Sequence, residues 1–315
     1  MTAARVHRFG PPGVIQFETI DVPVPAENEV LVEVLAAGVG PWDAWVRAGK
    51  SALPQPLPLT PGSDVCGNVV GVGAAVTSFA AGDIVFGVTN ARFVGGYAQY
   101  AVAAADMLAI KPKSLSAIEA ASVPVIAATA EQMLFDHAQL RGGQTVFVHG
   151  GAGNVGAYAV QLAHHGGIRV MASAHRGDAD YVLGRGAERV IDLREGTFSD
   201  LNQSADAVID TVGGETQARL FELVKPGGIV VSAVSPPDQQ LAQQCRVRAV
   251  FFLVNVTTAR LTRLAAMFDG GELLTAIAAV LPLHEAVAAH EMLEGTRPHG
   301  RGKIVLRIDE LSRVA

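Results

Sequence analysis

The stretch Thr145-Val-Phe-Val-His149 followed at once by Gly150-Gly-Ala-Gly-Asn-Val-Gly156 decides the fold of this chain. Its first five residues predict a short strand, and residues 155–165 after the glycines predict a helix. Within the loop, the spacing G-x-G-x-x-G is met by Gly151, Gly153 and Gly156. Between a strand and a helix, this spacing is typical of a turn that binds a dinucleotide.

Each glycine of this loop has a physical reason. The first permits a tight turn, the second lets the backbone approach a pyrophosphate, and the third lets helix and strand pack closely. The helix start then offers free amide groups and the positive end of its dipole to the anion. The motif leaves one alternative open, a glycine-rich turn in another kind of doubly wound protein.

Working outward from the loop, short apolar runs alternate with helical segments. Strands are predicted at 145–149, 169–174, 189–192, 207–210, 229–234 and 249–254, and helices at 155–165, 179–185, 217–223 and 259–268. Continuous apolar strands between helices indicate a parallel sheet covered on both faces. We therefore predict an α/β fold with a doubly wound domain and a parallel six-stranded sheet.

The flanking segments have a different texture. Residues 1–115 are predicted to be mostly β, with a strand at 30–35. Ser116 and Glu119 have the spacing of a capping box and predict a helical stretch over 116–139, broken at Pro124. The tail predicts a helix at 283–293 and a strand at 303–308, which we expect to return to the first domain.

Composition excludes several classes of function. The net charge is −6 and the basic residues are scattered, which argues against nucleic-acid binding. No apolar run approaches the ~18 residues that cross a bilayer, and the first ten residues do not resemble a signal peptide. Two cysteines, Cys66 and Cys245, argue against disulfides and thiolate metal sites. We expect a cytoplasmic protein.

The tip of the second predicted strand bears on the choice of cofactor. An NAD site usually has an acid there to bind the ribose hydroxyls, whereas this chain has Ser173, His175 and Arg176. A guanidinium can pair with the 2′-phosphate of NADPH, and Ser173 can donate to the same group. We therefore predict NADPH; the alternative is that Arg176 is an ordinary solvated arginine.

At this point the chain resembles the quinone oxidoreductase-like, zinc-independent members of the medium-chain dehydrogenase/reductase superfamily. The resemblance covers nearly the whole length and is carried by segments 36–43, 61–64, 95–98, 150–156, 210–214 and 300–305. It implies a GroES-like catalytic domain formed by residues 1–118 and 277–315, and a Rossmann NADP-binding domain at 119–276. It also implies a cofactor cleft between the two domains and a homodimer or higher assembly.

Zinc members of this superfamily have ligands at the positions of Gly40, Ser63 and Val125, and none of these three residues ligates zinc. We therefore predict no metal site. Without a Lewis acid, alcohol oxidation is disfavoured. Reduction of a quinone or a polarised C=C bond is easier, because the nicotinamide hydride meets a carbon that is already electrophilic.

Few residues are candidates for the substrate cleft. Trp42 and Trp45 can form an aromatic wall for a planar acceptor or take part in ordinary packing. Asp43 can relay a proton or orient its loop, and we favour the structural role. Tyr97 either contacts the cofactor or packs. The proton can come from solvent, so an obligatory acid residue is not required.

The resemblance implies further cofactor contacts along the chain. Besides the glycines, these are Thr129, Ala152, Asn154, Val155, Val212, Gly213, Ser232, Val234, Phe252, Val254, Arg301 and Lys303. The function that we predict is NADPH-dependent reduction of a quinone or an α,β-unsaturated carbonyl, with a small-molecule carbonyl or quinone as the substrate. The alternatives are an enoyl or ketone reductase of a biosynthetic pathway, and a non-catalytic NADPH-binding redox sensor.

Overall fold

The computed structural model describes residues 1–192 and 201–308, and these form two compact units. Unit 1 comprises Met1–Val125 with Val256–Ala315, and unit 2 comprises Ile126–Asn255. These limits differ from those expected from the sequence, mainly at the second boundary. The helix α8 (Thr258–Asp269) belongs to unit 1, where its Thr258 hydroxyl donates to the carbonyl of Leu108 at 2.6 Å.

Unit 2 is built on a six-stranded sheet in which every neighbouring pair is parallel. The strand order is β10-β9-β8-β11-β12-β13. The bounds are β8 (Thr145–His149), β9 (Arg169–Ser173), β10 (Arg189–Ile191), β11 (Ala205–Asp210), β12 (Val224–Ser232) and β13 (Arg248–Phe251). This order reverses between β8 and β11, which places the topological switch point beside the glycine loop.

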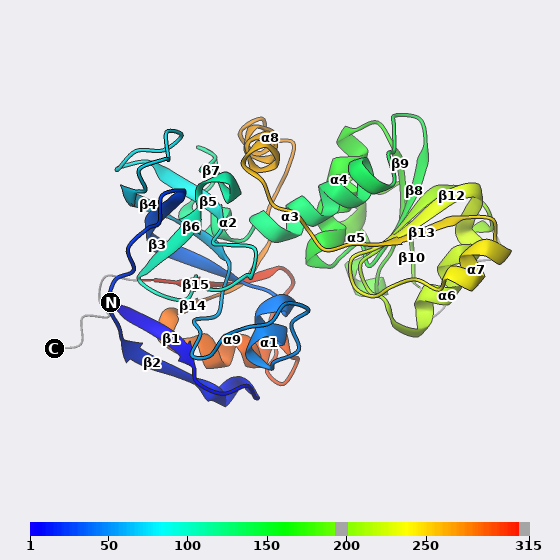
Figure 1. Ribbon diagram of the computed structural model, residues 1–315. Coiled ribbons are helices and arrows are strands. Elements are labelled where there is room, and N and C mark those ends of the chain that lie inside the picture. The colour runs from blue at the N-terminus through cyan, green and yellow to red at the C-terminus, as the bar shows by residue number, and fades with distance from the viewer. Residues whose placement is uncertain (193–200, 309–315) are drawn as a thin grey trace. The chain divides into compact units, whose positions relative to one another are not determined.

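Helices cover both faces of this sheet. Figure 1 shows α4 (Asn154–His165) and α5 (Ala179–Leu183) on one side of it, with α6 (Gln217–Leu220) and α7 (Gln239–Gln244) on the other. Shorter turns are η4 (Arg176–Asp178), η6 (Gly214–Thr216) and η7 (Phe221–Leu223). The predicted Rossmann fold with a parallel six-stranded sheet is confirmed.

Unit 1 is a β domain with a seven-stranded sheet in the order β14-β15-β3-β4-β5-β7, and β6 also pairs with β3. Its strands are β3 (Glu29–Val39), β4 (Asp64–Val72), β5 (Ile84–Val88), β6 (Tyr100–Ala104), β7 (Leu108–Ile110), β14 (Ile277–Pro282) and β15 (Lys303–Arg307). A separate hairpin consists of β1 (Thr2–Val6) and β2 (Ile15–Thr19). Short 3₁₀ turns are η1 (Pro12–Val14), η2 (Ala105–Met107) and η8 (Leu283–Glu285).

The tail returns to unit 1, as the sequence predicts. Strand β15 pairs antiparallel with β3, so the last described strand completes the sheet that begins near the N-terminus. The helix α9 (Ala286–Leu293) buries Ala286 and Ala289 in the same apolar cluster as Val34 and Leu306. Burial of this shared core ties residues from both ends of the chain into one unit.

The helical stretch predicted over 116–139 is present, and it is divided at Pro124. It consists of α2 (Ala117–Ala121), α3 (Pro124–Glu131) and a π-helical turn, η3 (Gln132–His137). The capping box is confirmed, because the Ser116 amide donates to Glu119 Oε2 at 2.8 Å and the Glu119 amide donates to Ser116 Oγ at 3.3 Å.

One helix lies where the sequence predicts a loop. The segment α1 (Pro41–Arg47) is helical because Pro41 supplies the fixed φ of a first helical position and Asp43 Oδ2 accepts a bond from the Gly40 amide at 2.8 Å. Strand β14 and helix α7 are also absent from the sequence-based assignment. Residues 1–192 and 201–308 include no helix with the length and apolar character that spanning a bilayer requires.

Candidate functional site

The glycine loop joins β8 to α4, and its shape depends on two close approaches. Gly150 has φ +85°, so it makes the left-handed turn that the sequence analysis gave to Gly151. A Cβ on Gly151 would meet Ala172 Cβ at 2.8 Å. A Cβ on Gly156 would lie 2.8 Å from the Gly150 carbonyl carbon, and closer still to its oxygen. Helix α4 can therefore begin against the strand only without side chains at these positions.

Gly153 differs from its neighbours. It has ordinary extended backbone angles, φ −73° and ψ 167°, and it is exposed. A Cβ placed on it meets the Gly150 oxygen at 3.3 Å and nothing else within 4 Å. The fold of the chain therefore does not require glycine here. Glycine at such a position allows a ligand to approach the backbone closely.

A row of polar residues ends four neighbouring strands beside this loop. In register across the sheet lie Ser173, His149, Asp210 and Ser232, from β9, β8, β11 and β12. All four are buried. Because ligands of open α/β sheets bind outside the carboxyl ends of the strands, this row defines the floor of the candidate site.

His149 lies at the centre of the row and bonds on both sides of its ring. Its Nδ1 is 2.7 Å from Ser173 Oγ and its Nε2 is 3.0 Å from Thr216 Oγ1. Burial lowers the pKa of His149, although nearby Asp210 opposes the effect. Ser173 Oγ also accepts a bond from the Gly150 amide at 3.0 Å. The predicted phosphate donor Ser173 thus holds the loop in place.

Asp210 organises the other half of the row. Its Oδ1 accepts bonds from the amides of Val212 at 3.1 Å and Gly213 at 2.9 Å, and its Oδ2 accepts from Ser232 Oγ at 3.0 Å and Gln217 Nε2 at 2.8 Å. The sequence analysis did not identify His149, Asp210 or Gln217 as site residues. A signal existed, because each of these four strands ends in a polar residue that follows three apolar residues.

The residues predicted to contact the 2′-phosphate lie at the end of β9 and just after it. His175 and Arg176 are exposed and follow the buried Ser173 directly. A carboxylate does lie nearby, from the end of the next strand: Asp192 Oδ2 accepts a bond from the Arg176 amide at 3.0 Å. The guanidinium of Arg176 extends from an exposed residue and is available to an anionic ligand.

The other predicted cofactor residues of unit 2 are distributed around the sheet. Thr129 is buried in α3. Val212 and Val234 are exposed at the loops after β11 and β12, beside the positive-φ Gly213. The Phe252 ring lies 4.3 Å from the His137 ring, centroid to centroid. The exposed Asn154 and the partly buried Ala152 and Val155 flank Gly153, while Val254 is partly buried.

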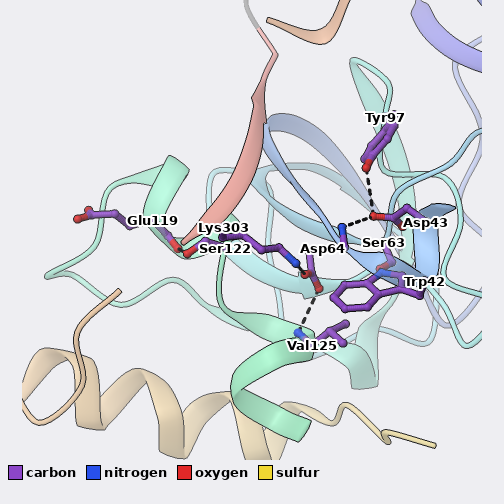
Figure 2. A network of polar contacts seen from close by, with 10 residues as sticks. Trp42, Asp43, Ser63, Asp64, Tyr97, Glu119, Ser122, Val125 and Lys303 are labelled. Carbon is purple, nitrogen blue, oxygen red and sulfur yellow. Dashed lines mark hydrogen bonds and ion pairs between the residues drawn. The ribbon is translucent and has the colours of Figure 1, made fainter. Parts of the chain in front are cut away.

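In unit 1, Trp42, Ser63, Asp64 and Lys303 form a connected polar cluster (Figure 2). Trp42 Nε1 donates to Ser63 Oγ at 2.9 Å. The Lys303 ammonium lies 4.3 Å from the centroid of the Trp42 ring and 3.2 Å from Asp64 Oδ2. The other oxygen, Asp64 Oδ1, accepts a bond from the Val125 amide at 3.1 Å. Lys303 is therefore a paired cation, whereas Arg301, two residues earlier, is exposed.

Asp43 and Tyr97 are fully buried and bonded to each other, as Figure 2 shows. The Tyr97 hydroxyl donates to Asp43 Oδ2 at 3.1 Å, and the same oxygen accepts from the Gly40 amide at 2.8 Å. Burial raises the pKa of Asp43 to about 7, and burial together with Asp43 raises the pKa of Tyr97. These contacts fix the start of α1, which is the structural role favoured for Asp43.

The positions that the family resemblance assigns to zinc ligands lie around this cluster. A Cβ on Gly40 would lie 2.6 Å from Trp42 Cε2, so the indole occupies the space that a larger residue would need. Ser63 is bonded to that indole and Val125 offers only its amide, to Asp64. Within the described part of the chain, no group of three or more His, Cys, Asp or Glu side chains is arranged to hold a metal.

Comparison with known proteins agrees with the two units. Residues 26–113 match the alcohol dehydrogenase GroES-like domain, and residues 185–306 match a family described as zinc-binding dehydrogenase. A GroES-like domain with a Rossmann domain defines an oxidoreductase of the medium-chain dehydrogenase/reductase class.

Similarity to individual proteins identifies a narrower family within this class. The chain is 33% identical over 97% of its length to quinone oxidoreductase from Sus scrofa, and covers 97% of that protein. It is 36% identical over 73% of its length to the NADPH-dependent alkenal/one oxidoreductase of Arabidopsis thaliana, covering 62% of that protein. The structure of the quinone oxidoreductase from Coxiella burnetii superposes with a TM-score of 0.90 at 31% identity, covering 98% of this chain and 99% of that one. The chain belongs to the quinone oxidoreductase-like family of this superfamily.

The buried Asp43 gives a pH-dependent stability that can be measured. Between its ordinary pKa of 3.8 and about 7, the folded state retains a proton that the unfolded state has lost, so stability falls as pH rises. We predict that the difference in free energy of unfolding between the wild type and Asp43→Asn depends on pH. This difference falls by up to ~1.4 kcal/mol per pH unit between pH ~5 and ~7 and is constant above pH ~7. Urea unfolding at pH 5, 6, 7 and 8 provides the measurement.

Subtracting the value for Asp43→Asn from that for the wild type cancels the contribution of a second buried group to the pH dependence of stability. Burial lowers the pKa of His290 to about 3, and this group adds stability as pH rises from about 3 to 6.5 in both proteins. A difference between wild type and Asp43→Asn that is flat across the whole pH range contradicts the assignment of the raised pKa to Asp43.

Proposed function

We propose that this protein is a zinc-independent reductase that transfers a hydride from NADPH to a quinone or an α,β-unsaturated carbonyl. The observation that carries the proposal is the replacement of the zinc-ligand positions Gly40, Ser63 and Val125 by a cluster with a tryptophan and a lysine–aspartate ion pair. A reductase of this kind acts on an acceptor that needs no metal to become electrophilic.

Unit 2 fits the dinucleotide. The open backbone at Gly153, the free amides at the start of α4 and the switch point between β8 and β11 supply a pyrophosphate site. Gly151, Ala152, Asn154, Val155 and Gly156 complete this loop. The alkenal/one oxidoreductase that the chain resembles is named for NADPH, and the exposed Arg176 supports the same choice here.

Buried polar residues at the strand ends fix the conformation of the loops around this site. His149, Ser173 and Asp210 fix the loops after β8, β9 and β11 through bonds of 2.7 to 3.1 Å. Burial lowers the pKa of His149 and so favours its neutral form, against the opposing effect of Asp210. Gly213, Ser232, Val234, Phe252 and Val254 line the adjoining strand ends, and we propose that their backbone groups contact the adenosine and nicotinamide portions.

NADPH supplies a hydride from its nicotinamide ring when bound. The protein then has to orient the acceptor and deliver one proton, so that the acceptor gains two electrons and two hydrogens in total. Since Asp43 and Tyr97 are fully buried and bonded to each other, we propose that water delivers the proton and that these two residues support α1. The half-buried Trp42 is the residue of unit 1 that we assign to the acceptor.

The test is NADPH oxidation measured with a panel of quinones, enones, enals and ketones on protein whose zinc content is determined by mass spectrometry. We predict turnover of quinones or conjugated carbonyls, release of quinol or saturated carbonyl, less than about 0.1 zinc per chain, and no loss of rate with a chelator. Stoichiometric zinc, or a product that is an alcohol, contradicts the proposal. Tight NADPH binding without turnover of any acceptor favours the redox-sensor alternative.

Arg176→Ala tests the choice between the two nicotinamide dinucleotides. Loss of a charge-assisted contact with the 2′-phosphate should raise the apparent KM for NADPH by about tenfold and leave that for NADH within about twofold. Arg219→Ala, in α6, is a control that removes an arginine from the same unit. An equal change for both cofactors rejects the assignment of Arg176.

Homodimer formation, a cytoplasmic location and the domain limits at 118/119 and 276/277 stay predictions from the sequence. For the last, the compact units favour limits near Val125 and Val256.

A further inference from the structure

Phe93 has an unusual backbone conformation. Its φ is +59°, in the left-handed region that favours glycine. Within residues 1–192 and 201–308, the non-glycine residues with positive φ are Phe93, Gln139, Gln203 and Arg246, and only Phe93 is apolar. A bulky residue in this conformation costs free energy, and such residues concentrate at ligand-binding sites.

The loop around Phe93 is fixed by hydrogen bonds. Thr89 Oγ1 and Asn90 Nδ2 donate to the Val94 carbonyl at 2.7 and 2.8 Å. The Phe93 amide donates to the Asn90 carbonyl at 3.0 Å, and the Gly95 amide donates to the Thr60 carbonyl at 2.8 Å. The surrounding structure therefore determines the backbone at Phe93 on both sides.

This conformation separates two neighbouring side chains. Val94 packs against the apolar core of unit 1. The Phe93 ring instead contacts Trp42 edge to face, with the centroids 6.4 Å apart and the planes at 63°. Both rings are half-buried. The strained backbone thus places the phenyl ring against a tryptophan rather than among the apolar core residues that Val94 contacts.

Trp42 is fixed independently of Phe93. Its indole N–H donates to Ser63, its ring lies beside the Lys303 ammonium, and the missing side chain of Gly40 makes room for it. Two aromatic rings are thus held in place before any ligand arrives. Preorganised aromatic rings bind a flat, conjugated ligand at low entropic cost, because little side-chain freedom is lost.

We propose that Phe93, together with Trp42, determines acceptor specificity by selecting planar cyclic acceptors such as quinones over acyclic enals. This proposal rests on the proposed function, since it names the acceptor class of the same site. Phe93 acts by binding the acceptor ring and takes no part in proton or hydride transfer.

Phe93→Gly is the decisive variant, because glycine suits the backbone while the ring is lost. The test is made in a Trp45→Phe background, where Trp42 is the remaining tryptophan and its fluorescence reports binding of 1,4-naphthoquinone without turnover. We expect the quinone Kd to rise about three- to tenfold, kcat/KM for trans-2-hexenal to stay within about twofold, and Tm to stay equal or increase.

Two further variants make the result specific. Phe93→Leu keeps an apolar side chain, and it should weaken quinone binding as Phe93→Gly does if ring contact is the cause. Gln203→Gly relieves the same kind of backbone strain at an exposed turn in unit 2, and it should leave quinone binding unchanged.

An unchanged quinone Kd in Phe93→Gly, an equal loss with quinone and enal, or full affinity in Phe93→Leu overturns the proposal. Failure of the proposed function has a different signature. The parent protein would then bind naphthoquinone at Trp42 but oxidise no NADPH, and the effect of Phe93→Gly on binding would still be measurable.

Discussion

The approach of helix α4 to the Gly150 carbonyl is the contact on which the site depends. It brings the first turn of the helix against the end of β8 and leaves no space for a side chain at Gly156. The amides that open α4 are thereby held at the switch point of the sheet, where the polar row from Ser173 to Ser232 closes four strands. A looser loop would aim these amides elsewhere and lose the anion site.

The proposed function divides the chemistry between the two units. Unit 2 supplies backbone groups and an exposed arginine, which suit a large anionic dinucleotide. Unit 1 supplies a tryptophan set between a serine and a buried lysine–aspartate pair, in place of metal ligands. The pair also costs the protein desolvation, and removal of Lys303 alone would leave a buried carboxylate without a counter-charge. The same residues thus hold β15 in the sheet and the indole in position.

Much of the fold could be predicted from local pattern. The six strands of unit 2, the capping box at Ser116 and the return of the tail follow from apolar runs, cap chemistry and family resemblance. The helix α1 could not be predicted in this way, because glycine followed by proline is typical of a loop. The bond from the Gly40 amide to Asp43 at the start of this helix is known only from the structure. The compact units place 256–276 with unit 1, whereas the sequence predicts these residues in the Rossmann domain, because the sequence of a helix does not indicate the unit against which it packs.

The site was predictable in its glycines and less so in its side chains. The motif spacing identifies Gly151, Gly153 and Gly156. The structure adds that Gly150 makes the turn and that a Cβ on Gly153 would meet only the Gly150 oxygen, at 3.3 Å. Asp43 and Tyr97 are candidates because they are titratable, whereas their full burial and mutual hydrogen bond become apparent only in the structure. The positive φ of Phe93 depends on hydrogen bonds between residues that a linear reading does not bring together.

The most direct test of the account is isothermal titration of NADPH into Gly153→Ala. Because a Cβ at this position meets little in the chain, the account predicts a Tm close to that of the wild type, but an affinity for NADPH reduced by about tenfold or more. Gly13→Ala, whose added Cβ has nothing within 4 Å, should leave both quantities unchanged. An unaltered affinity in Gly153→Ala, or no NADPH binding by the wild type, would contradict the account.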